Sequence, residues 1–272
     1  MKRLLIALLC LPLLAWSTPP RVVSLGGDVT EIVWALGAGD TLVARDSTSL
    51  QPQAVKALPD VGYLRQLNAE GILAMRPTLV LASAQAQPSL ALKQVQDSNV
   101  PVVTVPASLS PAAISEKIAV IAAALGKTDA GEQLITGQQK LIDALPRRAL
   151  NVRVLFIMSH SGINAMAAGS DTAADAAIRA AGLTNALANI RRYQSLSREG
   201  VITSRPDLIV VGADGLRTLG GENGVLALPG VEHTPAGKHG RIMVVDEVAL
   251  LGFGLRTAQT ILTLRRQAEA LR

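Results

Sequence analysis

One short segment of this chain carries a tyrosine and an arginine at a spacing that could bind a metal ion. In Gly62-Tyr63-Leu64-Arg65 the glycine lets the backbone turn, so that the Tyr63 ring can project from a loop. Arg65, two residues later, can lie beside the phenol oxygen, where a guanidinium favours the phenolate. A phenolate suits ferric iron, and tyrosine is a known axial ligand of haem iron. Spacing alone favours a simpler alternative, a tyrosine packed at the edge of a lobe beside a solvated Arg65.

The stretch after this motif occurs twice in the chain. Residues 67–83 read LNAEGILAMRPTLVLAS and residues 196–212 read LSREGVITSRPDLIVVG, at a constant offset of 129 positions. Each copy predicts a short helix, a stop at Arg-Pro and a buried strand. A repeat this far apart indicates two similar lobes rather than a solenoid, whose repeats are far shorter. We therefore expect a cleft between two lobes, with Tyr63 beside it.

The repeat carries a matched pair of acids, Glu70 and Glu199, one in each predicted helix. A glycosidase-type couple would need the two carboxyl groups within about 10 Å of each other, which two separated lobes make difficult. Distant matched acids better suit docking onto a two-fold symmetric partner that presents arginines. Two ordinary acids on helix surfaces would leave the recurrence of the charge unexplained.

Short apolar runs in each half of the chain predict strands covered on both faces of a parallel sheet. They lie at residues 21–25, 79–82, 102–105, 153–158, 208–211 and 242–245. The segment 127–147 predicts one long helix of about 17 residues, capped by Thr128 or Asp129. Asp28, with Glu31 at capping-box spacing, and Asp171 are expected to cap two shorter helices. The expected fold is α/β, with two Rossmann-like lobes, 19–126 and 148–272, joined by that single helix. No Gly/Ser-rich linker separates the lobes, so the cleft should be largely preformed.

His160 is a further candidate site residue, expected in a loop after the strand at 153–158. Ligands of open α/β sheets bind at the carboxyl ends of strands, where this residue would lie. A loop histidine that makes one hydrogen bond is an equally good interpretation. No acid partner for a Ser-His-Asp triad is identifiable, and the common nucleotide, hydrolase and metalloprotease motifs are missing.

The first 18 residues resemble a secretory signal peptide, cleaved near Ser17/Thr18. Lys2 and Arg3 precede an apolar run that is too short to span a bilayer. The single cysteine, Cys10, lies in that run, so the mature chain would have no thiol. The formal charge falls from +5 to +3 without Lys2 and Arg3, and no run of five basic residues exists. With 2% aromatic residues, this composition argues against nucleic-acid binding.

Taken together, these motifs resemble the periplasmic haem-binding proteins of bacterial haem ABC importers, which belong to the helix-linked class III periplasmic binding proteins. RVVSLGGDVTEIVWALG and both copies of the repeat carry the resemblance to the class. The resemblance to haem binders rests on DSTS, residues 46–49, and VGYLRQLNAEGILAM, residues 61–75. It covers essentially the whole mature chain and implies a non-catalytic carrier in the periplasm.

The resemblance also implies a role for each candidate residue. Tyr63 would be the axial ligand of the haem iron, and Arg65 would stabilise its phenolate. His160 would ligate the same iron from the other side or a second, stacked haem, giving one or two haems per chain. Glu70 and Glu199 would dock the protein onto an inner-membrane permease dimer with its ATPase, downstream of an outer-membrane haem receptor. Arg45, Arg191 and Arg192 are candidate partners for the haem propionates.

Two other functions remain open at this point. The same scaffold could bind a ferric siderophore or cobalamin, in which case Tyr63 would not contribute to affinity. A periplasmic haem-dependent enzyme, such as a peroxidase or a haem-degrading oxygenase, would need acid-base groups beside the haem, and His160 is the one plausible candidate.

Overall fold

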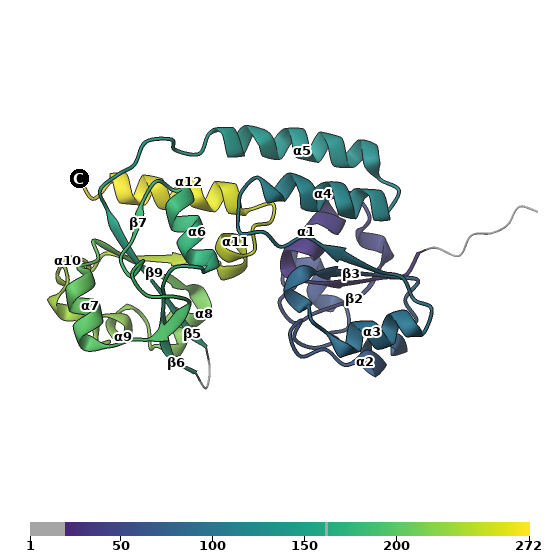
Figure 1. Cartoon of the computed structure of the whole chain (residues 1–272), viewed down its shortest axis with the longest axis horizontal. Coiled ribbons are helices and arrows are strands. Elements are labelled where there is room, and N and C mark those ends of the chain that lie inside the picture. The colour runs from purple at the N-terminus through teal and green to yellow at the C-terminus, as the bar shows by residue number, and fades with distance from the viewer. Residues whose placement is uncertain (1–19, 161–162) are drawn as a thin grey trace, which may run out of the picture.

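The chain folds into two α/β lobes connected along one side by a long helix (Figure 1). The computed structural model describes residues 20–160 and 163–272. The long helix, α5 (Thr128–Asp143), packs against α4 (Ala113–Ala124) of the first lobe and α12 (Thr257–Glu269) of the second. The predicted fold, two α/β lobes joined by a single long helix, is confirmed. The proposed signal peptide with Cys10, and Ser161 and Gly162, lie outside the described residues.

The first lobe, here called the N-lobe, is built on a four-stranded parallel sheet in the order β2-β1-β3-β4. Its elements are β1 (Val22–Leu25), α1 (Gly27–Ala35), β2 (Leu42–Arg45), α2 (Ala69–Ala74), β3 (Leu79–Ser83), α3 (Leu90–Asp97), β4 (Val102–Val105) and α4, with short 3-10 helices at Gly39–Thr41, Gln53–Ala57 and Ala84–Ala86. Successive residues of β1 face opposite ways: Val22 packs with the α1 and α4 side chains, and Val23 packs with those of α2 and α3. Two apolar layers therefore enclose the sheet, as the continuous apolar runs predicted.

The second lobe, the C-lobe, has a mixed six-stranded sheet in the order β10-β9-β5-β6-β8, with β7 paired to β5. Its elements are β5 (Arg153–His160), β6 (Ile163–Ala168), α6 (Ala173–Ala180), β7 (Thr184–Asn185), β8 (Tyr193–Ser195), α7 (Arg198–Ser204), β9 (Leu208–Gly212), α8 (Ala213–Thr218), α9 (Glu222–Leu226), α10 (Pro235–Lys238), β10 (Ile242–Val245), α11 (Glu247–Leu251) and α12, with a 3-10 helix at Val231–His233. The parallel part matches the prediction, whereas the antiparallel β5-β6-β8 extension does not follow from the apolar runs.

Both copies of the repeat fold as the sequence predicts, a short helix followed by a buried strand. α2 leads to β3 and α7 leads to β9, with Asn68 and Ser197 capping the two helices through their side chains. Arg76 and Arg205 end the helices with φ of 48° and 44°, the left-handed region. A residue before proline is disfavoured in the right-handed helical region, so each Arg-Pro pair stops its helix at the same place.

Three predicted helix caps are wrong. α1 starts after Gly26 without a side-chain cap, because the Asp28 carboxylate is held by Lys117 instead. α6 is capped by Thr172 rather than by its neighbour at 171, and α5 starts after Lys127 with no side-chain cap. Among the described residues we find no helix that combines a membrane-spanning length with sufficient apolar character.

Candidate functional site

A pocket of about 390 Å³ opens between the two lobes, where the sequence predicted a cleft. Its N-lobe wall comes from Glu31 of α1 and from the segment 47–56, and its C-lobe wall comes from His160, from the start of α8 and α11, and from Arg256. The volume falls in the range of about 300–1,000 Å³ that small-molecule sites occupy. Residues far apart in the chain therefore meet in one concave site.

Tyr63 lies next to the N-lobe wall of this cleft. Gly62 has φ of 100°, as expected for a glycine that turns the backbone before an exposed ring. The Ser47 amide donates to the Gly62 carbonyl at 2.9 Å, which ties this loop to a residue lining the cleft. The Tyr63 side chain is 44% exposed, one of the few large apolar residues in that state. Its ring is therefore accessible to a ligand.

A buried carboxylate shapes the wall beside Tyr63. Asp46 is fully buried and accepts hydrogen bonds from the Gly26 amide (2.9 Å), the Thr48 hydroxyl (2.6 Å) and the Ser49 hydroxyl (2.6 Å). Four-residue loops of this kind hold a fixed shape when a buried acceptor is satisfied by several donors. The DSTS motif thus has a structural role, since it fixes the loop that carries the cleft wall.

Arg65 is exposed and donates to Oε1 of Gln85 at 3.3 Å. We find no hydrogen bond between Arg65 and Tyr63 among the described residues, so the contact expected from the sequence stays a prediction for the ligand-bound protein. Burial raises the pKa of Tyr193 in the other lobe, and the Arg65 charge weakly opposes that rise. Arg65 therefore lies near the C-lobe, although it does not line the cleft pocket.

Tyr193, the second tyrosine of the chain, is in a different environment. Burial raises the pKa of its phenol to about 12, and the nearby Glu247 carboxylate acts in the same direction, against the smaller effect of Arg65. The phenolate of Tyr193 is therefore harder to form than that of an ordinary tyrosine. Of the two tyrosines, Tyr63 is the more exposed and so the more accessible to a ligand.

His160 lies on the C-lobe wall of the cleft. It is the last residue of β5 and not a loop residue as predicted, because β5 continues into the β6 hairpin. Its Nε2 is 3.4 Å from Oε2 of Glu247, and the two side chains are 42% and 18% exposed. Burial raises the pKa of Glu247, an effect that His160 opposes. Sequence reasoning missed this acid partner because it lies in the first turn of α11, far along the chain.

The predicted propionate partners are not placed at the cleft. Arg45 is buried and its guanidinium binds Asp60 at 2.9 Å and two backbone carbonyls, so it is fully used inside the N-lobe. Arg191 pairs with Asp171 on the C-lobe surface, and Arg192 is exposed but does not line the cleft pocket. The basic side chains that line the cleft are Lys56 and Arg256, neither of which the sequence singled out.

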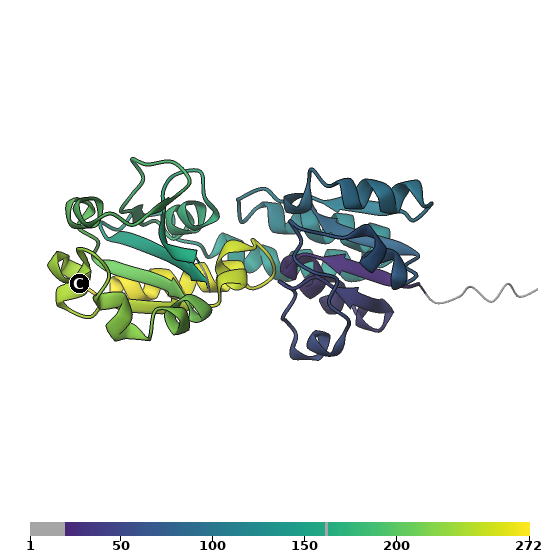
Figure 2. The same cartoon turned by 90° about the horizontal axis from the view of Figure 1, so that it is seen from below.

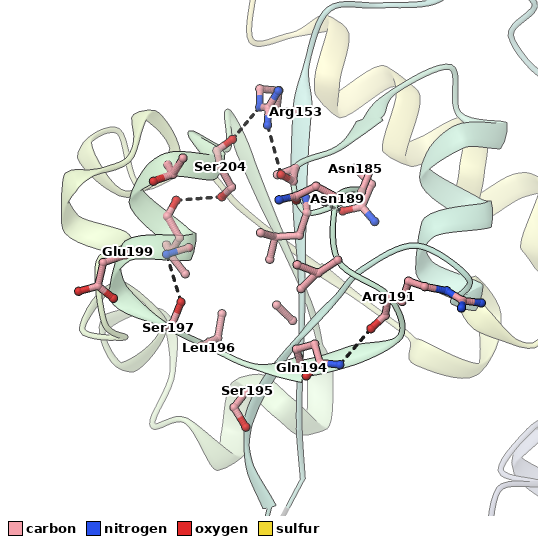
Figure 3. Close-up of a pocket in the computed structure, with 18 of the residues that line it drawn as sticks. Arg153, Asn185, Asn189, Arg191, Gln194, Ser195, Leu196, Ser197, Glu199 and Ser204 are labelled. Carbon is pink, nitrogen blue, oxygen red and sulfur yellow. Dashed lines mark hydrogen bonds between the residues drawn. The ribbon is translucent and has the colours of Figure 1, made fainter.

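Glu70 and Glu199 are exposed, each in the first turn of its helix, and neither lines the cleft. Glu70 borders a hollow of about 560 Å³ between α2 and α3. Glu199 borders a larger pocket of about 930 Å³ between α7 and the segment 184–197, which includes β7 and β8, with its carboxylate pointing away from the pocket (Figure 3). Glu70 and Glu199 therefore do not act as a pair on one ligand in the cleft.

The comparisons with known proteins agree with this geometry. The profile of a family described as "Periplasmic binding protein" matches residues 22–249. The chain belongs to the periplasmic binding protein family. An ABC transporter substrate-binding lipoprotein of Bacillus subtilis, YvrC, which is uncharacterized, is 27% identical over 84% of this chain and 73% of its own length.

Solved structures of other members are similar over nearly the whole chain. The periplasmic heme-binding protein RhuT from Roseiflexus sp. RS-1, in apo form, is 38% identical, with a TM-score of 0.88 over 94% of this chain and all of its own. BhuT, in complex with two hemes, is 39% identical, with a TM-score of 0.86 over 93% and 99%. HutB of Vibrio cholerae is 36% identical, with a TM-score of 0.80 over 92% and 98%. These structures confirm the class III fold and the resemblance drawn from the sequence.

The raised pKa of Tyr193 can be tested directly. In the Tyr63→Phe protein the remaining phenol should ionise with a midpoint near pH 12, well above the ordinary value of about 10, because burial disfavours the phenolate. Tyrosinate absorbance followed against pH measures this, with circular dichroism to show that the protein stays folded. In urea the midpoint should return to about 10. A folded-state midpoint near 10 would contradict the assignment of Tyr193 as the neutral phenol.

Proposed function

We propose that this protein binds haem in the cleft between its lobes and delivers it to an inner-membrane ABC permease. The observation that carries the proposal is the position of Tyr63, an exposed phenol on a fixed loop beside the cleft, opposite the wall that holds His160. Phenolate oxygen is a ligand that ferric haem iron accepts. RhuT, BhuT and HutB, which share nearly their whole length with this chain, are named heme-binding proteins, and this supports haem as the ligand.

The rest of the cleft suits a flat apolar ligand with two acidic groups. Leu50, Ala213 and Val248 offer apolar surface, which stabilises a buried apolar face by about 25 cal/mol per Å². Lys56, exposed on the N-lobe wall, and Arg65 are the cations we propose for the propionates. Glu31, Asp246 and Glu247 line the same pocket. Their negative charge would direct the propionates towards the solvent.

The similarity to cobalamin-binding proteins covers less of the chain than the similarity to heme-binding proteins, so cobalamin is a less suitable ligand. The vitamin B12-binding protein of Pectobacterium carotovorum is 36% identical over 33% of this chain and 32% of its own length. The haem-binding relatives match over more than nine-tenths of this chain. The cobalamin relationship thus covers part of a shared scaffold, whereas the haem relationship covers nearly all of it.

Replacing Tyr63 tests the function. Tyr63→Phe keeps the ring but removes the ligating oxygen, so haem affinity should fall at least tenfold, or about 1.4 kcal/mol, with loss of the ferric-phenolate absorption band. Haemin titration of the purified protein followed by absorption spectroscopy measures both. Tyr193→Phe is the matched control and should keep wild-type affinity, since Tyr193 is a buried neutral phenol. Unchanged affinity and spectrum in Tyr63→Phe would show that the Tyr63 phenol does not ligate the iron, and would refute the proposed site.

His160 is proposed as a second haem contact from the C-lobe. If it ligates a second, stacked haem, His160→Ala should lower the stoichiometry from two haems to one; if it completes the coordination of one iron, the stoichiometry should hold and the ligand-field bands should shift. BhuT, a relative whose structure is in complex with two hemes, is the reason to test both arrangements of haem. His239→Ala, an exposed histidine away from the cleft, is the control. Titrations and spectra identical to wild type would leave His160 as the partner of Glu247 only.

Glu70 and Glu199 are proposed to dock the protein onto the permease. Reversing both charges, Glu70→Arg with Glu199→Arg, should lower haem-dependent growth at least tenfold, because like charges would face each other at the docking surface. Haem titration should be unchanged, since neither residue lines the cleft. The matched control reverses Glu116 and Glu222, which are also exposed acids in the first turns of helices. Wild-type growth of the Glu70/Glu199 variant would refute the docking role.

A further inference from the structure

The two lobes touch at a second place besides α5, through the segment 252–256 that links α11 to α12. Phe253 packs in the apolar core of the C-lobe, and Leu255 packs against the apolar core of the N-lobe. Side chains two positions apart are thus anchored in different lobes. Figures 1 and 2 show this yellow segment reaching the start of the N-lobe from the inner edge of the C-lobe.

A buried lysine fastens this segment to the N-lobe. Lys117 of α4 is fully buried; its Nζ lies 2.5 Å from Oδ2 of Asp28 in α1 and donates to the Gly252 carbonyl at 2.7 Å. The fit is close, since a Cβ placed on Gly254 would lie 2.9 Å from the Asp28 Cβ. One ammonium group therefore satisfies a carboxylate of the N-lobe and a backbone carbonyl of the C-lobe.

Arg256 makes a second ionic connection at the same junction. Its Nη2 and Nε donate to Oε1 of Glu31 at 2.6 and 3.1 Å, and its Nη1 donates to Oδ2 of Asp246 at 2.6 Å. Glu31 belongs to α1 of the N-lobe, and Asp246 caps α11 of the C-lobe. The planar guanidinium therefore bridges the lobes, which a lysine could not do with the same geometry.

The three groups depend on one another electrostatically. Burial raises the pKa of Glu31, while the hydrogen bond and charge of Arg256 oppose that rise. Burial also acts to raise the pKa of Asp246, but its hydrogen bond with Arg256 makes the net change a decrease. Arg256 thus favours the charged form of both carboxylates, and removing it would leave two acids close together in a partly buried place.

These ion pairs lie inside the ligand cleft, because Glu31, Asp246 and Arg256 all line the pocket between the lobes. We infer that segment 252–256 is a second, non-covalent joint between the lobes, and that Arg256 and Glu31 are positioning residues that set the width of the cleft. A single helix leaves the lobes free to rock about its ends, whereas two separate connections restrain that rotation. Where the ligand is concerned, the inference rests on the proposed function, because the joint would hold the Tyr63 and His160 walls at the separation haem requires.

The width of the cleft can be measured without any ligand. The mature chain would contain no cysteine, so spin labels on Leu90→Cys in α3 and Asn223→Cys in α9 would be the only ones present. Both helices lie on the side of the molecule away from α5, one on each lobe (Figure 1). Pulsed electron paramagnetic resonance then reports the distance between the lobes.

Glu31→Gln keeps the shape of the side chain and removes the charge that Arg256 binds. We expect its distance distribution to broaden and its mean to increase by several ångströms. Arg256→Lys keeps the charge but cannot span both carboxylates, so it should also widen the distribution. Glu269→Gln is the matched control, because it removes an Arg265–Glu269 pair at 2.7 Å that lies within α12 and does not cross the lobes. That variant should keep the wild-type distribution.

The outcomes distinguish a joint that controls the distance between the lobes from ion pairs that only stabilise the fold locally. If Glu31→Gln lowers the melting temperature but leaves the distance distribution as in wild type, the pair stabilises the fold and the inference is overturned. A wild-type distribution in Arg256→Lys would overturn the bridging role, since charge alone would then suffice. The distances are measured without haem, so they test the joint even if the chain proves to bind another ligand. With haem, a widened cleft should lower affinity about tenfold in Glu31→Gln and leave Glu269→Gln unchanged.

Discussion

The arrangement of the lobes depends on a fully buried ion pair, Lys117 with Asp28, located where they meet. Taking two charges out of water is costly, and removing one partner from such a pair commonly destabilises a protein by about 3–5 kcal/mol. Here the cost is offset by close geometry and by the Gly252 carbonyl, which accepts a hydrogen bond from the same ammonium group. Because that carbonyl comes from the other lobe, this hydrogen bond of Lys117 forms only when the lobes are in this relative position. A buried charge thereby makes one orientation of the lobes preferable to its alternatives.

A second buried carboxylate performs a similar task for the site itself. Asp46 is inaccessible to solvent, and its oxygens accept from a backbone amide of α1 and from the hydroxyls that follow it in the chain. The loop it shapes is bonded in turn to the carbonyl of Gly62, so the position of the Tyr63 backbone follows from a carboxylate that no ligand touches. An exposed ring on an unsupported loop would lose conformational freedom on binding, which costs affinity. The fixed loop avoids much of that cost.

The parts of this structure that the sequence predicted are those encoded locally. Continuous apolar runs predicted six of the strands, and the Arg-Pro stops of the repeat predicted how both of its helices end. Tyr63 could be proposed as a ligand from the sequence because its motif is short and contiguous. The misses involve long-range partners: Asp28 has cap spacing but pairs with a lysine 89 positions away, and Glu247 meets His160 only after the C-lobe has folded. β2 was missed because its four residues end in an arginine, and that arginine, Arg45, proved to be buried and paired with Asp60.

A carrier must hold its ligand firmly and still release it, and the positions of the groups suggest how both are possible. Glu70 and Glu199 lie one on each lobe, outside the cleft, whereas the ion pairs of Arg256 lie within it. A partner bound at both glutamates would contact the lobes far from the junction between them. A small force applied there would therefore exert a larger torque on the ion pairs of Arg256. Those contacts are only partly buried, and partly exposed ion pairs are weaker than enclosed ones. The hydrogen bond from the buried Lys117 ammonium to the Gly252 carbonyl, by contrast, would resist complete separation, so that the cleft could open to release its ligand without the two lobes coming apart.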